Sequence, residues 1–131
     1  MKGFIPYQYP DGQPTPWEYL PAAAGDYEVG AALGFSAGKL TLLTGGTAAP
    51  QYICMCDKTG NPDGGVLPVI RVEAGVVYAS GLSVDAAGIQ VGAKYTIDAT
   101  GRMVTATETD GVAQVTAYDG KTAGSAVYVR F

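Results

Sequence analysis

The chain has 131 residues, the length of a single domain with room for an apolar core. Apolar residues make up 47% and charged residues 15%, and the formal net charge is −4 with no basic cluster. This composition excludes a disordered acidic tail and argues against nucleic-acid binding through neutralised phosphates. The absence of histidine excludes Ser–His–Asp and Cys–His catalysis and His-ligated zinc. No apolar run has the length of a secretory signal or a membrane span, so we expect no membrane partner.

Residues 1–25 differ in composition from the rest of the chain. They contain five of the eight prolines and five of the thirteen aromatic residues. Prolines at this density forbid a helix and favour an extended backbone, which predicts an extended N-terminal arm. Disordered tails are poor in aromatic residues, so we expect the arm to pack on its own domain or on a partner, with Trp17 and Tyr19 as the main anchors. The candidate partner-binding residues are Phe4, Tyr7, Tyr9, Trp17 and Tyr19.

Residues 26–131 consist of short apolar or alternating runs that glycine-containing turns separate every 8–12 residues or so. This spacing predicts one all-β domain, a small antiparallel β-sandwich or barrel. The predicted strands are 29–35, 39–43, 52–57, 66–73, 76–79, 94–97, 103–107, 112–118 and 126–131. The predicted turns are 36–38, 58–60, 74–75, 99–101, 110–111 and 119–120. Only residues 83–90 could form a helical turn, and Gly88 argues against it.

Alternating side chains assign the faces of two predicted strands. Val127, Val129 and Phe131 share one side of the last strand, with Tyr128 and Arg130 on the other. By the same rule, the side chains at positions 95 and 97 oppose those at 94 and 96. One buried and one exposed face is the usual arrangement of antiparallel sheets.

Cys54 and Cys56 are the only cysteines, and they lie two residues apart on a predicted strand. A disulfide between them would be strained, because their side chains leave one face with Cα atoms too far apart. A zinc site needs further cysteine or histidine ligands that the sequence lacks. We therefore expect two reduced thiols with a packing role, as in a protein made in a cytoplasm.

Residues 57–64 have oxygen-bearing side chains at every second position, as at the start of a calcium loop. Counted from Asp57, however, Pro62 stands where such a loop needs glycine, and Pro68 stands where it needs glutamate. A polar hairpin loop is therefore favoured, and a loose calcium site is the alternative. We predict no metal and no cofactor.

Twelve carboxylates are enough for a glycosidase-like catalytic pair. Asp11, Asp63, Asp110 and Asp119, however, each precede a glycine, and Asp98 precedes the predicted turn 99–101. Aspartates at such positions accept hydrogen bonds from the local backbone. A hydrolase with paired carboxylates is therefore the least favoured function, and we predict no catalytic residues.

The C-terminal half contains the segments VGAKYTIDATGRMVTAT (91–107), GVA (111–113) and AGSAVYVRF (123–131), and YICMCDKTG (52–60) and LPVIRV (67–72) precede them. These segments resemble the small head-surface proteins of tailed bacteriophages, the capsid decoration and head-fibre proteins. The resemblance covers about residues 50–131.

This resemblance implies a non-enzymatic all-β protein on the capsid surface of a phage or prophage, made in the cytoplasm of the bacterial host. Such a protein would stabilise the head, display a surface for contact with the host or a glycan, or do both. It also implies a homotrimer whose extended arm contacts the major capsid protein or a neighbouring protomer. The chain lacks a coiled-coil or repeated shaft, which favours a short decoration knob over a long fibre. The alternative function is a carbohydrate-binding or adhesion β-sandwich in which tyrosine and tryptophan form a platform for a surface glycan.

Overall fold

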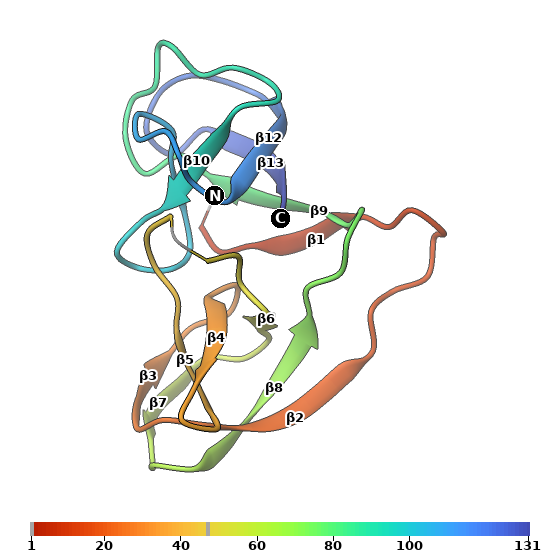
Figure 1. Cartoon of the computed structure of the whole chain (residues 1–131), viewed down its shortest axis with the longest axis vertical. Coiled ribbons are helices and arrows are strands. Elements are labelled where there is room, and N and C mark those ends of the chain that lie inside the picture. The colour runs from red at the N-terminus through yellow and green to blue at the C-terminus, as the bar shows by residue number, and fades with distance from the viewer. Residues whose placement is uncertain (1, 47) are drawn as a thin grey trace.

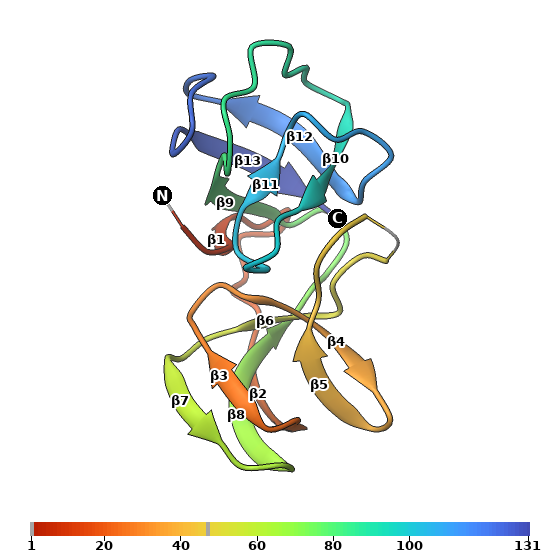
Figure 2. The same cartoon turned by 90° about the vertical axis from the view of Figure 1, so that its left-hand side faces the viewer.

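The computed structural model describes residues 2–46 and 48–131, and over these residues the chain forms thirteen strands and no helix. The predicted all-β class is confirmed, with several antiparallel sheets. A six-stranded sheet and a barrel lie one above the other along the longest axis (Figures 1 and 2). In this part of the chain no helix is long and apolar enough to cross a membrane.

The barrel closes in the order β2-β5-β4-β6-β8. Its strands are β2 (Trp17–Ala22), β4 (Ala32–Ser36), β5 (Lys39–Leu42), β6 (Tyr52–Cys54) and β8 (Gly65–Arg71). Strands β2 and β8 pair in antiparallel fashion over their whole shared length, from Trp17 opposite Ile70 to Ala22 opposite Gly65. Beside the barrel, β3 (Gly25–Tyr27) and β7 (Lys58–Asn61) form a two-stranded sheet.

The six-stranded sheet has the order β1-β9-β13-β12-β10-β11, and all of its neighbouring strands are antiparallel. Its strands are β1 (Ile5–Gln8), β9 (Val77–Gly81), β10 (Lys94–Ile97), β11 (Val104–Thr105), β12 (Ala113–Tyr118) and β13 (Ala126–Arg130). The chain therefore starts in this sheet, forms the barrel and then returns, as the red β1 beside the green β9 shows in Figure 1.

The segment predicted as an N-terminal arm has an extended backbone over β1 and β2. Strand β1 pairs with β9 at the edge of the six-stranded sheet, and β2 pairs with β8 in the barrel. The sequence left open whether this segment packs on its own domain or on a partner. In the structure, its backbone pairs with strands of its own chain. Each half of the molecule thus receives one strand from the first 25 residues.

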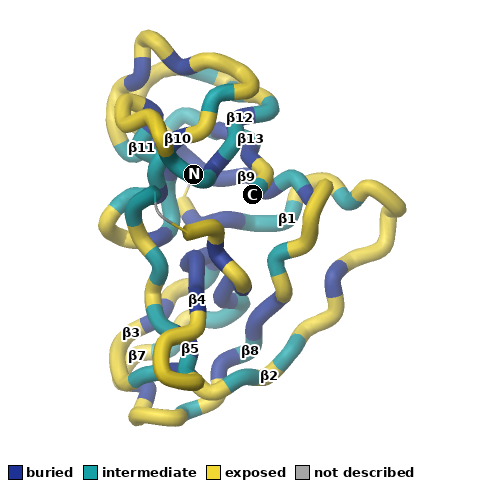
Figure 3. Tube along the Cα trace, viewed as in Figure 1, coloured by how far each residue is buried: buried dark blue, intermediate teal, exposed yellow. Residues whose placement is uncertain are grey.

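Two apolar clusters fill the molecule, and Figure 3 shows buried segments in both halves with exposed turns around them. The smaller cluster lies inside the barrel and includes Leu33, Leu40 and Leu67. The larger cluster fills the six-stranded sheet and also takes in Ile53 and Ile70 from the barrel strands. The two halves therefore share one continuous apolar contact, and burial of this area is the main stabilising contribution.

A close backbone crossing joins the N-terminal residues to the loop before β4. The Phe4 amide donates to the Gly30 carbonyl oxygen at 2.8 Å, and the Gly3 amide donates to the Arg102 carbonyl oxygen at 2.9 Å. The Arg102 Nε also donates to the Val29 carbonyl oxygen at 3.1 Å. Gly30 has a φ of +85°, and a Cβ on it would lie 2.4 Å from the Gly3 Cα atom. Only glycine fits such a crossing.

Several predicted elements agree with the structure. The predicted strand 94–97 coincides with β10, and its alternation is confirmed because Tyr95 and Ile97 are buried. Val127 and Val129, predicted to share one side of the last strand, are both buried, so that side of β13 faces the core. In the predicted turns, Ala37 and Asp110 have positive φ, the conformation that these turns require.

Two predictions near the cysteines are wrong. The predicted strand 52–57 ends early, because β6 stops at Cys54. The predicted turn 58–60 is part of strand β7, which pairs with β3. The Gly60 amide donates to Asp26 Oδ1 at 2.7 Å, so a contact distant in sequence overrides the local turn signal. The helical turn considered at 83–90 does not form.

Candidate functional site

The five aromatic residues predicted to bind a partner differ in how far they are exposed in the structure. Phe4 has no exposed surface, and its ring lies 5.3 Å from that of Phe131 in an edge contact. The prediction for Phe4 as a partner-binding residue is therefore wrong, because the six-stranded sheet and the barrel enclose its side chain. Tyr9 is partly buried against the same core. Tyr7, Trp17 and Tyr19 remain exposed, at 57%, 52% and 66% of their surface.

Strands β2 and β8 carry a row of exposed apolar side chains on the outside of the barrel. Trp17, Tyr19 and Pro21 are exposed and alternate with less exposed residues along β2, so they share the outer face. Pro68 lies opposite Tyr19, and Val66, 49% exposed, lies opposite Pro21. We call these five residues the β2–β8 face. The paired strands hold it in place, and none of its side chains is charged.

One end of this strand pair is fixed by a charged contact. Arg71 Nε and Nη2 donate to the two carboxylate oxygens of Glu18 at 3.2 and 3.1 Å, and the guanidinium lies 5.7 Å from the ring centroid of Tyr52. The hydrogen bond and the charge of Glu18 raise the pKa of Arg71. An exposed ion pair adds little stability, so its main effect is on the orientation of these side chains.

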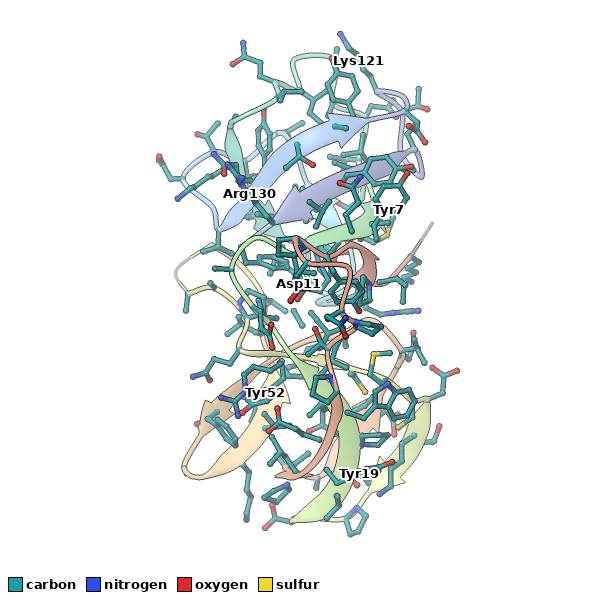
Figure 4. All side chains as sticks on the ribbon, turned by 90° about the vertical axis from the view of Figure 1, so that its right-hand side faces the viewer. Tyr7, Asp11, Tyr19, Tyr52, Lys121 and Arg130 are labelled. Atoms are coloured by element: carbon teal, nitrogen blue, oxygen red, sulfur yellow. The ribbon has the colours of Figure 1, made fainter. Side chains whose placement is uncertain are left out.

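Tyr7 lies in the other half of the molecule, beside a hollow of about 390 Å³. In Figure 4 its label lies at the six-stranded sheet, and that of Tyr19 lies at the far end of the barrel. Tyr128 and Asp119 line the same hollow. Sequence analysis assigned them only to an outer strand face and a turn. Asp119 follows β12 and Tyr128 lies on β13, the two strands of one hairpin. From this hairpin their proximity could have been predicted from the sequence.

The two cysteines are free thiols. Cys54 is buried inside the barrel, and its Sγ donates to the Cys56 carbonyl oxygen at 3.2 Å. Burial raises the pKa of the Cys54 thiol from 9.0 to about 11. Thiolate is the reactive form, so Cys54 is protected at neutral pH both by burial and by protonation.

We expect one thiol, that of partly exposed Cys56, to react with a thiol reagent at pH 8 in the native protein, and both to react in denaturant. Because the folded-state pKa of Cys54 is raised, its contribution to stability is complete below pH 9 and is lost as the pH rises toward 11. Colorimetric thiol titration and unfolding at stepped pH measure both effects. Equal labelling rates for the two thiols in native protein would contradict this placement.

The polar segment 57–64 was considered as a loose calcium site, but two of its carboxylates contact other groups of the protein. Asp57 Oδ1 accepts a hydrogen bond from the Val29 amide at 2.9 Å, and Asp63 pairs with Lys39 Nζ at 2.7 Å. Across residues 2–46 and 48–131, no three His, Cys, Asp or Glu side chains are grouped so that they could hold a metal ion. The calcium alternative therefore has no support from the geometry.

Asp98 behaves as a turn aspartate, as predicted from its position. Its Oδ1 accepts hydrogen bonds from the Thr100 hydroxyl at 2.8 Å and from the Met103 amide at 3.1 Å. These hydrogen bonds stabilise the connection between β10 and β11 and occupy the Asp98 carboxylate.

No family model matches the chain, and the comparison with curated proteins found no significant match. The β2–β8 face and the hollow beside Tyr7 are the two exposed aromatic sites from whose chemistry a function can be inferred.

Proposed function

We propose that the protein is a non-enzymatic structural protein of the outer surface of a phage capsid, a decoration or head-fibre protein that binds the major capsid protein as a homotrimer. It would be made in the cytoplasm of the bacterial host and become part of the virion. The observation that carries the proposal is the β2–β8 face, with Trp17 and Tyr19 exposed on a rigid strand pair.

The physical chemistry of this face suits contact with another protein. Tryptophan and tyrosine are the residues that most often dominate binding energy at interfaces. Pairing of β2 with β8 fixes their backbone in advance, so binding orders few additional groups. Because the face has no charged side chain, covering it removes no ion from water.

The placement of the phage-like segments also supports the proposal. Residues 91–107, 111–113 and 123–131 contribute to β10, β11, β12 and β13, which are adjacent in the six-stranded sheet. Residues 52–60 and 67–72 contribute to β6, β7 and β8, so the resemblance extends to the strand that carries half of the β2–β8 face. We propose that the barrel binds the capsid. The first 25 residues contribute to this contact by supplying strand β2, which carries Trp17 and Tyr19.

Combined Trp17→Ala and Tyr19→Ala substitutions are expected to weaken binding to purified capsids of the phage that encodes this chain by about 100-fold. Both side chains are more than half exposed, so the variant is expected to fold. Co-sedimentation with heads measures binding, and light scattering measures the molar mass. The matched control is Tyr7→Ala, an exposed tyrosine in the other half.

A monomer without affinity for heads would contradict the proposal, as would full capsid binding by the double variant. Point variants are the better choice over a truncation near Asp26, because such a truncation removes β2, a strand of the barrel. Loss of binding after the truncation would then report unfolding as much as loss of a contact.

A further inference from the structure

The hollow beside Tyr7 lies on the outer face of the six-stranded sheet. It is about 390 Å³ in volume, within the range of small-molecule sites. Its lining comes from β1, β9, β12 and β13 and from the turn after β12, segments far apart in sequence that sheet pairing brings together. The lining residues are Tyr7, Gln8, Val77, Thr116, Ala117, Asp119 and Tyr128.

Two aromatic rings form one wall of this hollow. The Tyr7 and Tyr128 ring centroids are 4.6 Å apart with an interplanar angle of 47°, and Tyr7 is 57% exposed. Tyr128 supports Tyr7 from one side, which leaves the other ring surface for a ligand. An exposed, supported aromatic ring can stack on the apolar C–H face of a sugar ring.

Polar groups lie beside the rings and are oriented by hydrogen bonds. The Tyr128 hydroxyl donates to Asp119 Oδ2 at 3.0 Å, and this bond raises the pKa of Tyr128. The Thr116 hydroxyl donates to the Tyr128 carbonyl oxygen at 3.2 Å. Asp119 Oδ1 and the Gln8 side-chain amide have no hydrogen-bond partner among the described residues. They can therefore accept from and donate to ligand hydroxyl groups.

The charge of the hollow limits the ligand class. Asp119 is its one charged lining residue, and no lysine or arginine contributes to the lining. An acidic sugar would be repelled by this carboxylate, whereas the hydroxyl groups of a neutral sugar would donate to it. We propose that the hollow beside Tyr7 binds a neutral sugar ring of a glycan, with Tyr7 as the stacking platform and Asp119 and Gln8 as hydrogen-bonding groups.

This site is independent of the proposed capsid contact. The β2–β8 face lies on the barrel, and the hollow lies on the six-stranded sheet. Figure 4 shows Tyr7 and Tyr19 at separate positions along the long axis. A protein that binds a capsid through one half can therefore present a sugar site on the other.

Saturation-transfer NMR with maltotriose, mannotriose, lactose, chitotriose and sialyllactose, each at millimolar concentration, tests the proposal. We expect transfer to at least one of the neutral sugars and none to sialyllactose. Tyr7→Ala and Asp119→Ala are each expected to lower the affinity about tenfold or more. Tyr19→Ala, the matched exposed tyrosine, is expected to leave sugar binding unchanged. Circular dichroism checks that each variant is folded.

The proposal is overturned if none of the four neutral sugars binds, or if folded Tyr7→Ala binds them like the unsubstituted protein. Sialyllactose binding as strong as that of lactose would overturn the assignment to neutral rings. The two proposals are tested separately by the double variant of Trp17 and Tyr19. If this variant loses capsid binding but still binds sugar, the two sites are independent, as proposed.

Discussion

Replacement of Gly30 by alanine is expected to destabilise the protein by about 3 to 5 kcal/mol, a large part of the roughly 5 to 15 kcal/mol that stabilises a typical domain. Two effects add at this position. The φ of +85° is strained for any residue with a Cβ. The added Cβ would also lie 2.4 Å from the Gly3 Cα and 2.7 Å from the Phe4 amide nitrogen, and neither backbone atom can rotate away.

Urea and thermal unfolding followed by circular dichroism measure this loss. The matched control is Gly38→Ala, because Gly38 has a φ of +78° but no atom within 4 Å of its added Cβ. We expect the control to lose about 1 to 2 kcal/mol, from backbone strain alone. Equal losses in the two variants would show that the crossing of residues 3–4 with residue 30 contributes nothing to the fold.

Phe4→Ala is expected to cost about 3 to 5 kcal/mol of unfolding free energy. The Phe4 side chain is fully buried, and it packs in the larger apolar cluster with Tyr78 and Val129. Its removal leaves a cavity that the paired strands around it can close only in part. It also removes the edge contact with the Phe131 ring.

Denaturant unfolding of Phe4→Ala beside Tyr7→Ala tests this result. Tyr7 is 57% exposed and its variant loses the contact with the Tyr128 ring, so the unfolding free energy is expected to fall by about 1 kcal/mol. If Phe4 were a partner anchor, its removal would leave stability unchanged and weaken capsid binding instead. That outcome would restore the interpretation of Phe4 drawn from composition.

Local patterns predicted the parts of the fold that local physics determines. Strand β13 shows this clearly, because alternation placed Val127 and Val129 on the same side, and that side is buried. Glycine and aspartate marked turns for the same reason, since positive φ at Asp110 and Gly101 is a property of single residues. Asp98 was assigned to a turn by its position, and its hydrogen bonds are local.

Pairing between distant segments could not be predicted in this way. Proline and aromatic residues correctly indicated an extended backbone for the first 25 residues, but they carry no information on which strand lies alongside. Ile5 pairs with Ala79, and this register decides that Phe4 faces the core. The error at residues 58–60 has the same origin, because β7 exists only through its pairing with β3.

The candidate sites were predictable to different degrees. The alternation along β2 places Trp17 and Tyr19 on one face, but only pairing with β8 decides that this face is the outer one. The hollow beside Tyr7 needs four strands in a fixed order, so composition could indicate a sugar platform but not its place. Two of its lining residues, Asp119 and Tyr128, come from one hairpin, so their proximity could have been predicted from the sequence.

The return of the chain to its first sheet determines the order in which the protein can be built on the ribosome. The barrel uses strands between residues 17 and 71, so all of its strands are available before β9 has been made. Strand β1 must wait for β9, and β9 gains its second neighbour only when β13 has been synthesised. Phe4 and its neighbours therefore stay uncovered until β13 has been made, and an uncovered apolar surface of this kind favours aggregation of the nascent chain.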